Sequence, residues 1–303
     1  MLGHDQFHDE EKLQRARSEI PQGQVSYIPD ESGALRALAQ VNQELVREIG
    51  RRCAEQQIAT IDLDATIIES WKKQAKPTYQ GGKGYQPMLA VWAEMDLVLP
   101  VARHAFQALP AGVQELYFRG DAACWERELV NWLRDEEGRQ GPRGRITFGI
   151  RVRMTPNLKK HIRQGELFAD GSEAKYFVVA SNEWNRGAKK LLEWHREKAG
   201  TIEAVHDVLK NELAGGVMPC GRFGANAAWM RLALLTHNVL TALKRIGLPE
   251  PWLRSRPKRL RFQIFRSPAK LVHHARRVLL RVRRAKAQLI EWCEVWRLMP
   301  VAS

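Results

Sequence analysis

The stretch Thr60-Ile61-Asp62-Leu63-Asp64-Ala65-Thr66-Ile67-Ile68 decides how this chain folds, because it places carboxylates inside an apolar strand. Side chains alternate between the two faces of a strand, so Asp62, Asp64 and Thr66 share one face. Buried acids flanked by isoleucine and leucine need a partner. The stretch therefore predicts a metal site, although an acid in a strand more commonly lies at an edge or near a turn.

Two more acids stand out, one at the end of a second apolar run and one within a helical pattern. Asp121 ends the run Leu116-Tyr117-Phe118-Arg119-Gly120-Asp121, and Glu203 lies within a helix-like stretch from Thr201 to Lys210. Mg²⁺ prefers oxygen ligands, and two such ions can hold the attacking and leaving oxygens of a phosphodiester. Together the three acids favour phosphoryl transfer. Taken alone, Asp121 is better interpreted as a helix cap and Glu203 as an exposed helical residue.

The order of apolar patterns predicts an α/β fold with a mixed sheet flanked by helices. Three regions are expected: a helical segment over 1–57, a catalytic domain over 58–240 and a basic helical region over 241–303. The strands predicted near 145–152 and 175–180 are assigned to a β-rich insertion at about 135–182. Adjacent strand ends would bring Asp64 and Asp121 together. Glycines 81, 82 and 84 predict a hairpin turn rather than a phosphate loop.

Positive charge is concentrated near the C-terminus. The formal net charge is +14, and the segment from Lys244 to Lys286 holds fifteen Lys and Arg against one acid, Glu250. The remaining 33 basic and 33 acidic residues cancel. Such a patch favours a polyanion, because neutralising phosphates releases condensed counterions. Aromatic residues between the arginines favour nucleic acid over a merely solvated surface.

Composition excludes several classes of protein. Hydrophobic residues make up 44% of the chain, yet no run reaches the roughly 20 apolar residues of a membrane helix. The four cysteines are scattered without a C-x-x-C pair, which indicates reduced thiols in a cytoplasmic protein and no zinc or disulfide framework. His195 and His206 lack zinc-ligand spacing and are interpreted as packing or surface residues.

Three blocks of sequence resemble the DDE transposases of bacterial insertion sequences. The D-x-T at Asp64-Ala65-Thr66, with Gly84-Tyr85-Gln86-Pro87-Met88 downstream, resembles the first-acid block. Tyr117-Phe118-Arg119-Gly120-Asp121 resembles the second, and Ile202-Glu203 with Lys210 resembles the third. The likeness extends from about Ser26 to Arg284 and includes a subgroup with a β-rich insertion before the catalytic Glu.

The resemblance implies an RNase H-like fold on which Asp64, Asp121 and Glu203 bind Mg²⁺, for which Mn²⁺ can substitute. It implies DNA as partner, both element ends and target, and allows a homodimer. Asp62 becomes a neighbour of the metal ligands. The residues expected to bind DNA come from the Glu203 helix and the basic segment, and they are Arg196, Lys198, Lys210, Lys258, Arg259, Arg261, Arg276, Arg277, Arg281, Arg283 and Arg284.

The chain also departs from that family. About sixty residues precede Asp64, where relatives carry a longer DNA-binding region, and a strand and acidic stretch are skipped after Leu99. These differences leave a non-catalytic DNA-binding remnant of a transposase as the alternative to an active enzyme. A repair nuclease of RNase H-like fold is a third hypothesis.

Overall fold

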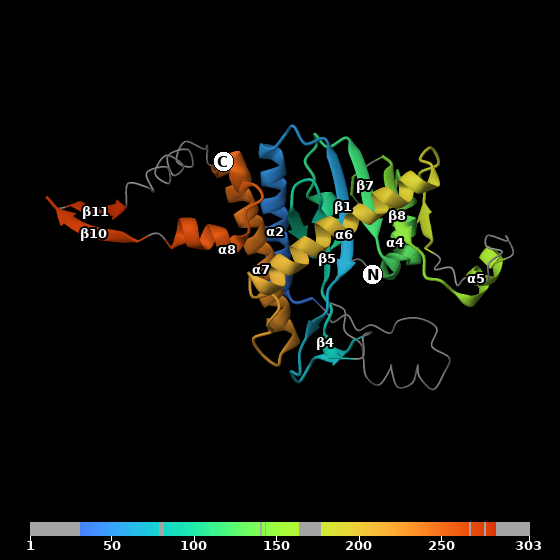
Figure 1. Ribbon diagram of the computed structural model, residues 1–303, viewed down its shortest axis with the longest axis horizontal. Helices are drawn as coiled ribbons and strands as arrows, with labels where there is room; N and C mark the ends of the chain where they lie inside the picture. Colours follow the sequence, from blue (N-terminus) through green and yellow to red (C-terminus); the bar gives the residue numbers. More distant parts are fainter. Residues whose placement is uncertain are drawn as a thin grey trace, which may run out of the picture.

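A computed structural model describes residues 31–78, 82–139, 141–142, 144–163, 177–266, 268–275 and 277–282. Its centre is a six-stranded mixed sheet in the order β6-β5-β1-β7-β8-β9 (Figure 1). The strands are β1 (Ile58–Ala65), β5 (Met88–Trp92), β6 (Leu97–Leu99), β7 (Glu115–Gly120), β8 (Ile146–Arg151) and β9 (Val179–Ser181). The predicted α/β class with a mixed sheet is confirmed.

The directions of the strands explain how the sheet is assembled. β5 pairs antiparallel with both β1 and β6; a short turn joins β5 to β6, whereas the chain between β1 and β5 contains a separate small sheet. β7 and β8 run parallel to β1, and each is reached through a helical crossover. Parallel neighbours need such crossovers because the chain must return to the starting edge. The carboxyl ends of β1, β7 and β8 consequently lie at one edge of the sheet.

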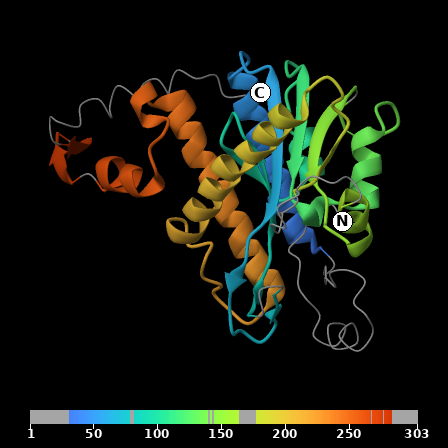
Figure 2. The same ribbon diagram turned by 45° about the vertical axis from the view of Figure 1, so that its right-hand side comes forward.

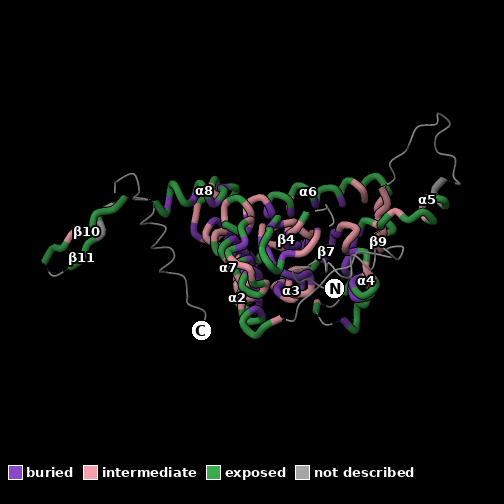
Figure 3. Tube along the Cα trace, turned by 90° about the horizontal axis from the view of Figure 1, so that it is seen from below, coloured by how far each residue is buried: buried purple, intermediate pink, exposed green. Residues whose placement is uncertain are grey.

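Helices cover both faces of the sheet, with the strands between them in Figure 3. One face packs on α2 (Gly33–Arg52), α3 (Ala102–Gln107) and α4 (Arg127–Arg134) through a core that includes Ile61 and Leu63. The other face packs on α6 (Ala188–Asn211) and α7 (Phe223–Ala242) through a core that includes Leu89 and Val91. Since side chains of β1 alternate, Asp62 and Asp64 face α6.

The N-terminal helix forms where the apolar periodicity predicted it. Ser32 caps α2 by accepting from the backbone N–H of Leu35. Val46 and Ile49 then lie fully buried against the central sheet. α2 therefore contributes to the same core as β1, and the boundary expected at residue 57 stays a prediction.

A small three-stranded sheet extends from the edge at which β1 ends (Figures 1 and 2). Its strands are β2 (Ile68–Glu69), β3 (Lys76–Pro77) and β4 (Lys83–Tyr85), in the order β2-β4-β3. β3 and β4 pair antiparallel, as a hairpin requires. Gly84 is needed here because an added Cβ would collide with the carbonyl of Ile68.

The strands assigned to a separate insertion are part of the central sheet instead. β8 pairs parallel with β7, and β9 pairs antiparallel with β8. Ile146 and Ile150 are fully buried in the main core, as expected for a strand of the central sheet. An apolar strand pattern in the sequence does not show which sheet the strand joins. The helix α5 (Pro156–Arg163) follows β8, and residues 164–176 lie outside the described residues.

The basic C-terminal region is only partly helical, contrary to prediction. After α7 come η2 (Leu243–Gly247), η3 (Glu250–Trp252), α8 (Pro257–Leu260) and η4 (Arg261–Phe265), and then the strands β10 (Ala269–His274) and β11 (Arg277–Val282). His273 and His274, expected on a helix, belong to β10. The β10–β11 hairpin lies away from the central sheet in Figures 1 and 3. None of the described helices is long and apolar enough to cross a membrane.

Candidate active site

Asp64 and Asp121 lie side by side at the edge where the parallel strands end. Leu63 of β1 is paired with Gly120 of β7, so the next residue on each strand is an aspartate. Neighbouring strands are about 4.8 Å apart. Both carboxylates act on the buried thiol of Cys124, whose pKa is raised well above its usual value, first by burial and then by Asp121 and Asp64. The expected meeting of the two strand ends is confirmed.

The turn after β7 fixes the position of Asp121. Gly120 leaves room for the side chain of Cys124, because an added Cβ would lie 2.7 Å from the Cβ of Cys124. Asp121 then caps η1 (Ala122–Cys124), accepting from the backbone N–H of Ala123 at 3.0 Å. The interpretation of Asp121 as a helix cap is thus correct for η1, and among the described residues its other oxygen atom, Oδ2, has no hydrogen-bond partner.

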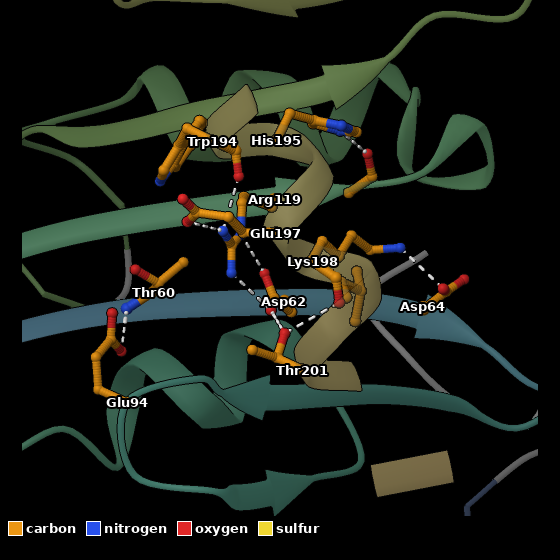
Figure 4. Close-up of polar contacts among 12 residues, drawn as sticks. Thr60, Asp62, Asp64, Glu94, Arg119, Trp194, His195, Glu197, Lys198 and Thr201 are labelled. Atoms are coloured by element: carbon orange, nitrogen blue, oxygen red, sulfur yellow. Dashed lines mark hydrogen bonds and ion pairs between the residues drawn. The ribbon is translucent and has the colours of Figure 1, made fainter. Parts of the chain in front are cut away.

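α6 crosses the face of the sheet on which Asp62 and Asp64 lie (Figure 4). The helix continues through Gly200, so Arg196, Glu203 and Lys210 lie on one uninterrupted helix. Gly149 of β8 allows the helix to approach, since a Cβ there would lie 2.9 Å from the ring of Trp194. Lys198 projects from α6 to the edge and donates to Oδ2 of Asp64 at 2.8 Å.

A second acid–base pair lies deeper in the same interface. Arg119 donates to both carboxylate oxygens of Asp62, at 2.6 and 2.9 Å, and the two side chains are 3% and 0% exposed. Arg119 also donates to the backbone carbonyl of Trp194 at 2.8 Å, and the hydroxyl of Thr201 donates to Asp62. These contacts join β1, β7 and α6 (Figure 4).

Two histidines of α6 are buried against the edge. The ring of His195 is hydrogen-bonded to the carbonyl of Gly120 at 3.0 Å, and burial lowers its pKa. Burial also lowers the pKa of His206 to about 4, against a smaller opposing effect of Asp64. In the part of the chain described, Nε2 of His206 has no hydrogen-bond partner. Both histidines are packing residues, as predicted, and neutral at pH 7.

Glu203 is not gathered with the two aspartates. It is exposed on α6, and at about 100° per residue it points roughly 140° around the helix from Lys198. Among the described residues, no group of three or more His, Cys, Asp or Glu is arranged to hold a metal ion. The role of Glu203 as a metal ligand stays a prediction.

The predicted DNA-binding residues differ in accessibility. Arg196 is exposed over the ring of Phe177. Lys198, expected to contact DNA, is instead buried and forms an ion pair with Asp64. Its ammonium group offsets the charge of that carboxylate. Lys210 is half-buried, and burial lowers its pKa. Of the DNA-binding residues predicted in the basic segment, Lys258, Arg259, Arg261, Arg277 and Arg281 are exposed, while Arg276, Arg283 and Arg284 lie outside the described residues.

Part of the positive charge of the basic segment is engaged within the protein. Lys244 is buried and its Nζ forms an ion pair with Oδ2 of Asp96 at 3.1 Å. Arg245 donates to the backbone carbonyls of Met95 and Glu94. Arg256 pairs with Asp207 and Glu212 at 2.5 Å. These three charges attach the segment to the sheet and to the end of α6, so the formal count overstates what a polyanion would meet.

Sequence reasoning missed Arg119. It stands within the apolar run before Asp121, where a buried guanidinium must be paired. Asp62, the second acid of β1, needs a partner for the same reason. Matching these two requirements would have predicted their contact across 57 residues of sequence.

Comparison with known protein families gives a match to part of the chain. The family described as Transposase DDE domain group 1 matches residues 158–289, which include α6, α7 and the basic segment but neither Asp64 nor Asp121. This match supports a DDE transposase, and the mixed sheet flanked by helices is compatible with the RNase H-like fold of that class. Comparison with curated proteins and comparison with solved structures each give no match.

Proposed function

We propose that this chain is the transposase of a bacterial insertion sequence, which cleaves DNA at the element's ends and joins it to a target. The observation that carries the proposal is the paired register of β1 and β7, which sets Asp64 and Asp121 side by side. The family match is independent support, because it rests on a different part of the chain.

The two aspartates suit a divalent metal ion by chemistry and position. They provide hard oxygen atoms at one edge, and Lys198 already supplies a positive charge to Asp64 there. Mg²⁺ or Mn²⁺ would stabilise the attacking and leaving oxygens of a phosphodiester. Glu203 in the present arrangement does not complete the set. We propose it as third ligand on the resemblance alone, which requires a different placement of its side chain.

The residues of the chain have distinct roles in this proposal. Asp64 and Asp121 are the metal-binding pair, and Arg119 with Asp62 holds α6 in position above them. Exposed cations such as Arg196, Lys258 and Arg259 contact phosphates. A homodimer and a cytoplasmic location remain predictions.

A nicking and strand-transfer assay tests the proposal. Purified full-length chain is incubated with DNA carrying the repeats that flank its reading frame, with Mg²⁺ or with Mn²⁺. Metal-dependent nicking that disappears in Asp121→Asn is expected. Asp135→Asn is the matched control, because Asp135 lies past the end of α4, away from the paired strand ends. Nicking that persists in Asp121→Asn would refute the assignment.

A second candidate is a DNA-binding remnant without catalysis. Lys198 neutralises Asp64, and Glu203 points away from the aspartates, an arrangement that serves stability without a metal. This candidate predicts weak nicking at most, with no preference for the element's own ends. Efficient, end-specific joining in the same assay would exclude it.

A further inference from the structure

Trp71 is 86% exposed in the loop between β2 and β3. A tryptophan normally contributes to stability by burying its large ring, so an exposed one forgoes that contribution. Exposure alone does not mark a binding site, because Trp184 is 87% exposed as well. The surroundings of the two rings distinguish them.

The loop that presents Trp71 is held in place from both sides. The backbone N–H of Ser70 donates to the carbonyl of Lys83 at 2.9 Å, and that of Ala75 donates to the carbonyl of Lys72 at 3.1 Å. Ala75 is buried in the core beneath α6 and α7. Gln74 accepts from the backbone N–H of Phe223 at the start of α7. Trp71 is therefore presented by an anchored loop.

The charge around this ring is positive. Lys72 and Lys73 follow Trp71 and are exposed. A Cβ added to Gly221 would lie 3.7 Å from the Cβ of Lys73, so the exposed Arg222 is close by. Glu69, an acid two residues before Trp71, interacts electrostatically with Lys210 and opposes the lowering of the Lys210 pKa by burial. Within the described ranges, no ion pair neutralises Lys72, Lys73 or Arg222.

The position of the loop connects it to the candidate active site. Trp71 follows Asp64 by seven residues, so the two are at most about 25 Å apart. That distance corresponds to about seven nucleotides of a DNA strand. Trp184 lies at the opposite edge, because it follows β9, which runs antiparallel to β8. Of these two highly exposed tryptophans, Trp71 is therefore the one that lies at the edge of the aspartates.

We propose that Trp71, Lys72, Lys73 and Arg222 form a binding site for an unpaired DNA strand. The indole ring stacks on a base, and the three cations contact the flanking phosphates. Stacking on a side chain requires a base whose face is free, which duplex DNA does not offer. The site goes beyond the proposed function, since it binds DNA without a metal and without cleavage.

Fluorescence anisotropy with the full-length chain tests this site in the absence of divalent metal. The probes are a labelled oligonucleotide of about 12 nucleotides, within the usual range of single-strand sites, and its duplex. Trp71→Ala should weaken single-strand binding by about 5- to 150-fold, the equivalent of about 1–3 kcal/mol per stacked base. Duplex binding, which depends on phosphate contacts, should change by less than about twofold.

Matched variants separate stacking from folding. Trp71→Phe keeps an aromatic face and should retain most of the affinity, whereas Trp184→Ala removes an equally exposed ring and should have no effect. A strand containing 5-iodouracil should cross-link on irradiation to the peptide that contains Trp71. Equal affinity of Trp71→Ala and wild type would overturn the proposal, as would conversion of a dimer to monomers by that variant. Failure of DNA cleavage leaves this test unaffected.

Discussion

Two acid–base pairs stand two residues apart on β1 and differ in depth. The inner pair, Asp62 with Arg119, is 0% and 3% exposed, with two hydrogen bonds between the side chains. The outer pair, Asp64 with Lys198, is 23% and 9% exposed, with a single contact of 2.8 Å. Both lie under α6 on the same face of the sheet (Figure 4).

The difference in depth separates a structural role from a chemical one. A buried pair with both carboxylate oxygens bonded cannot exchange its partner without leaving an uncompensated charge. A pair at the rim can, because water and ions reach the freed carboxylate. The D-x-D pattern of β1 therefore combines a buried, fixed ion pair at Asp62 with a more accessible, exchangeable ion pair at Asp64.

The largest effect should follow from breaking the inner pair. Arg119→Met leaves the carboxylate of Asp62 buried without its cation, which should lower the free energy of unfolding by about 3–5 kcal/mol. Urea-induced unfolding monitored by circular dichroism measures it. The double variant Arg119→Met/Asp62→Leu should recover part of the loss, because apolar replacements of a buried pair are tolerated. A loss below about 1 kcal/mol for the single variant would contradict the assigned role.

The sequence predicted that Asp64 and Asp121 would lie at neighbouring strand ends, but it did not predict which side chains contact the acids of β1. The first prediction was possible because each of the two aspartates ends an apolar run, which is a local signal. Lys198 was assigned to DNA binding from its place on the helix of Glu203. Its contact with Asp64 spans 134 residues, and periodicity carries no information about such contacts. His273 and His274 were assigned to a helix because charge does not distinguish helix from strand in an exposed segment.

Strand pairing limited the prediction of the fold in the same way. The residues of β8 and β9 were correctly predicted as strands, but their position in the central sheet depends on pairing with β7 and with each other. The strand β6 ends at Leu99, where the family's segment is skipped, and it has only three residues; it pairs with β5, so one strand separates it from β1.

His206 is buried beside the outer pair, and its burial should make the free energy of unfolding depend on pH. Burial lowers the pKa of His206 from 6.5 to about 4. Below pH 6.5 the unfolded chain binds a proton that the folded chain does not bind until about pH 4. The free energy of unfolding is therefore highest above pH 6.5 and decreases by about 3 kcal/mol in total as the pH falls to 4.

Comparison with His206→Leu isolates this contribution. Urea unfolding between pH 7 and pH 4 should give a flatter dependence for this variant than for wild type. His273→Leu is the matched control, because it removes an exposed histidine of β10 by the same substitution. Parallel curves for wild type and His206→Leu would show that His206 is not buried in its neutral form.

Exchange at the outer pair should be measurable as metal affinity. Lys198→Met removes the cation that contacts Asp64, so Mn²⁺ should bind at least about fivefold more tightly, a coupling of about 1 kcal/mol or more. Electron paramagnetic resonance of free Mn²⁺ gives the dissociation constant without an activity assay. Lys198→Arg keeps the charge and should bind like wild type. A gain that survives in Asp64→Asn/Lys198→Met would place the metal elsewhere.

The smallest effect belongs to the exposed end of the inner network. Glu197 accepts from Arg119 at 3.1 Å, but its side chain is 67% exposed, against 3% for Arg119. Water and salt screen such a contact, so Glu197→Gln should cost less than about 1 kcal/mol and the cost should shrink at 1 M salt. Urea unfolding at low and high salt measures both quantities. A cost as large as that of Arg119→Met would mean that the network acts as one unit, whereas a small and salt-sensitive cost assigns the stability to the buried contact between Asp62 and Arg119.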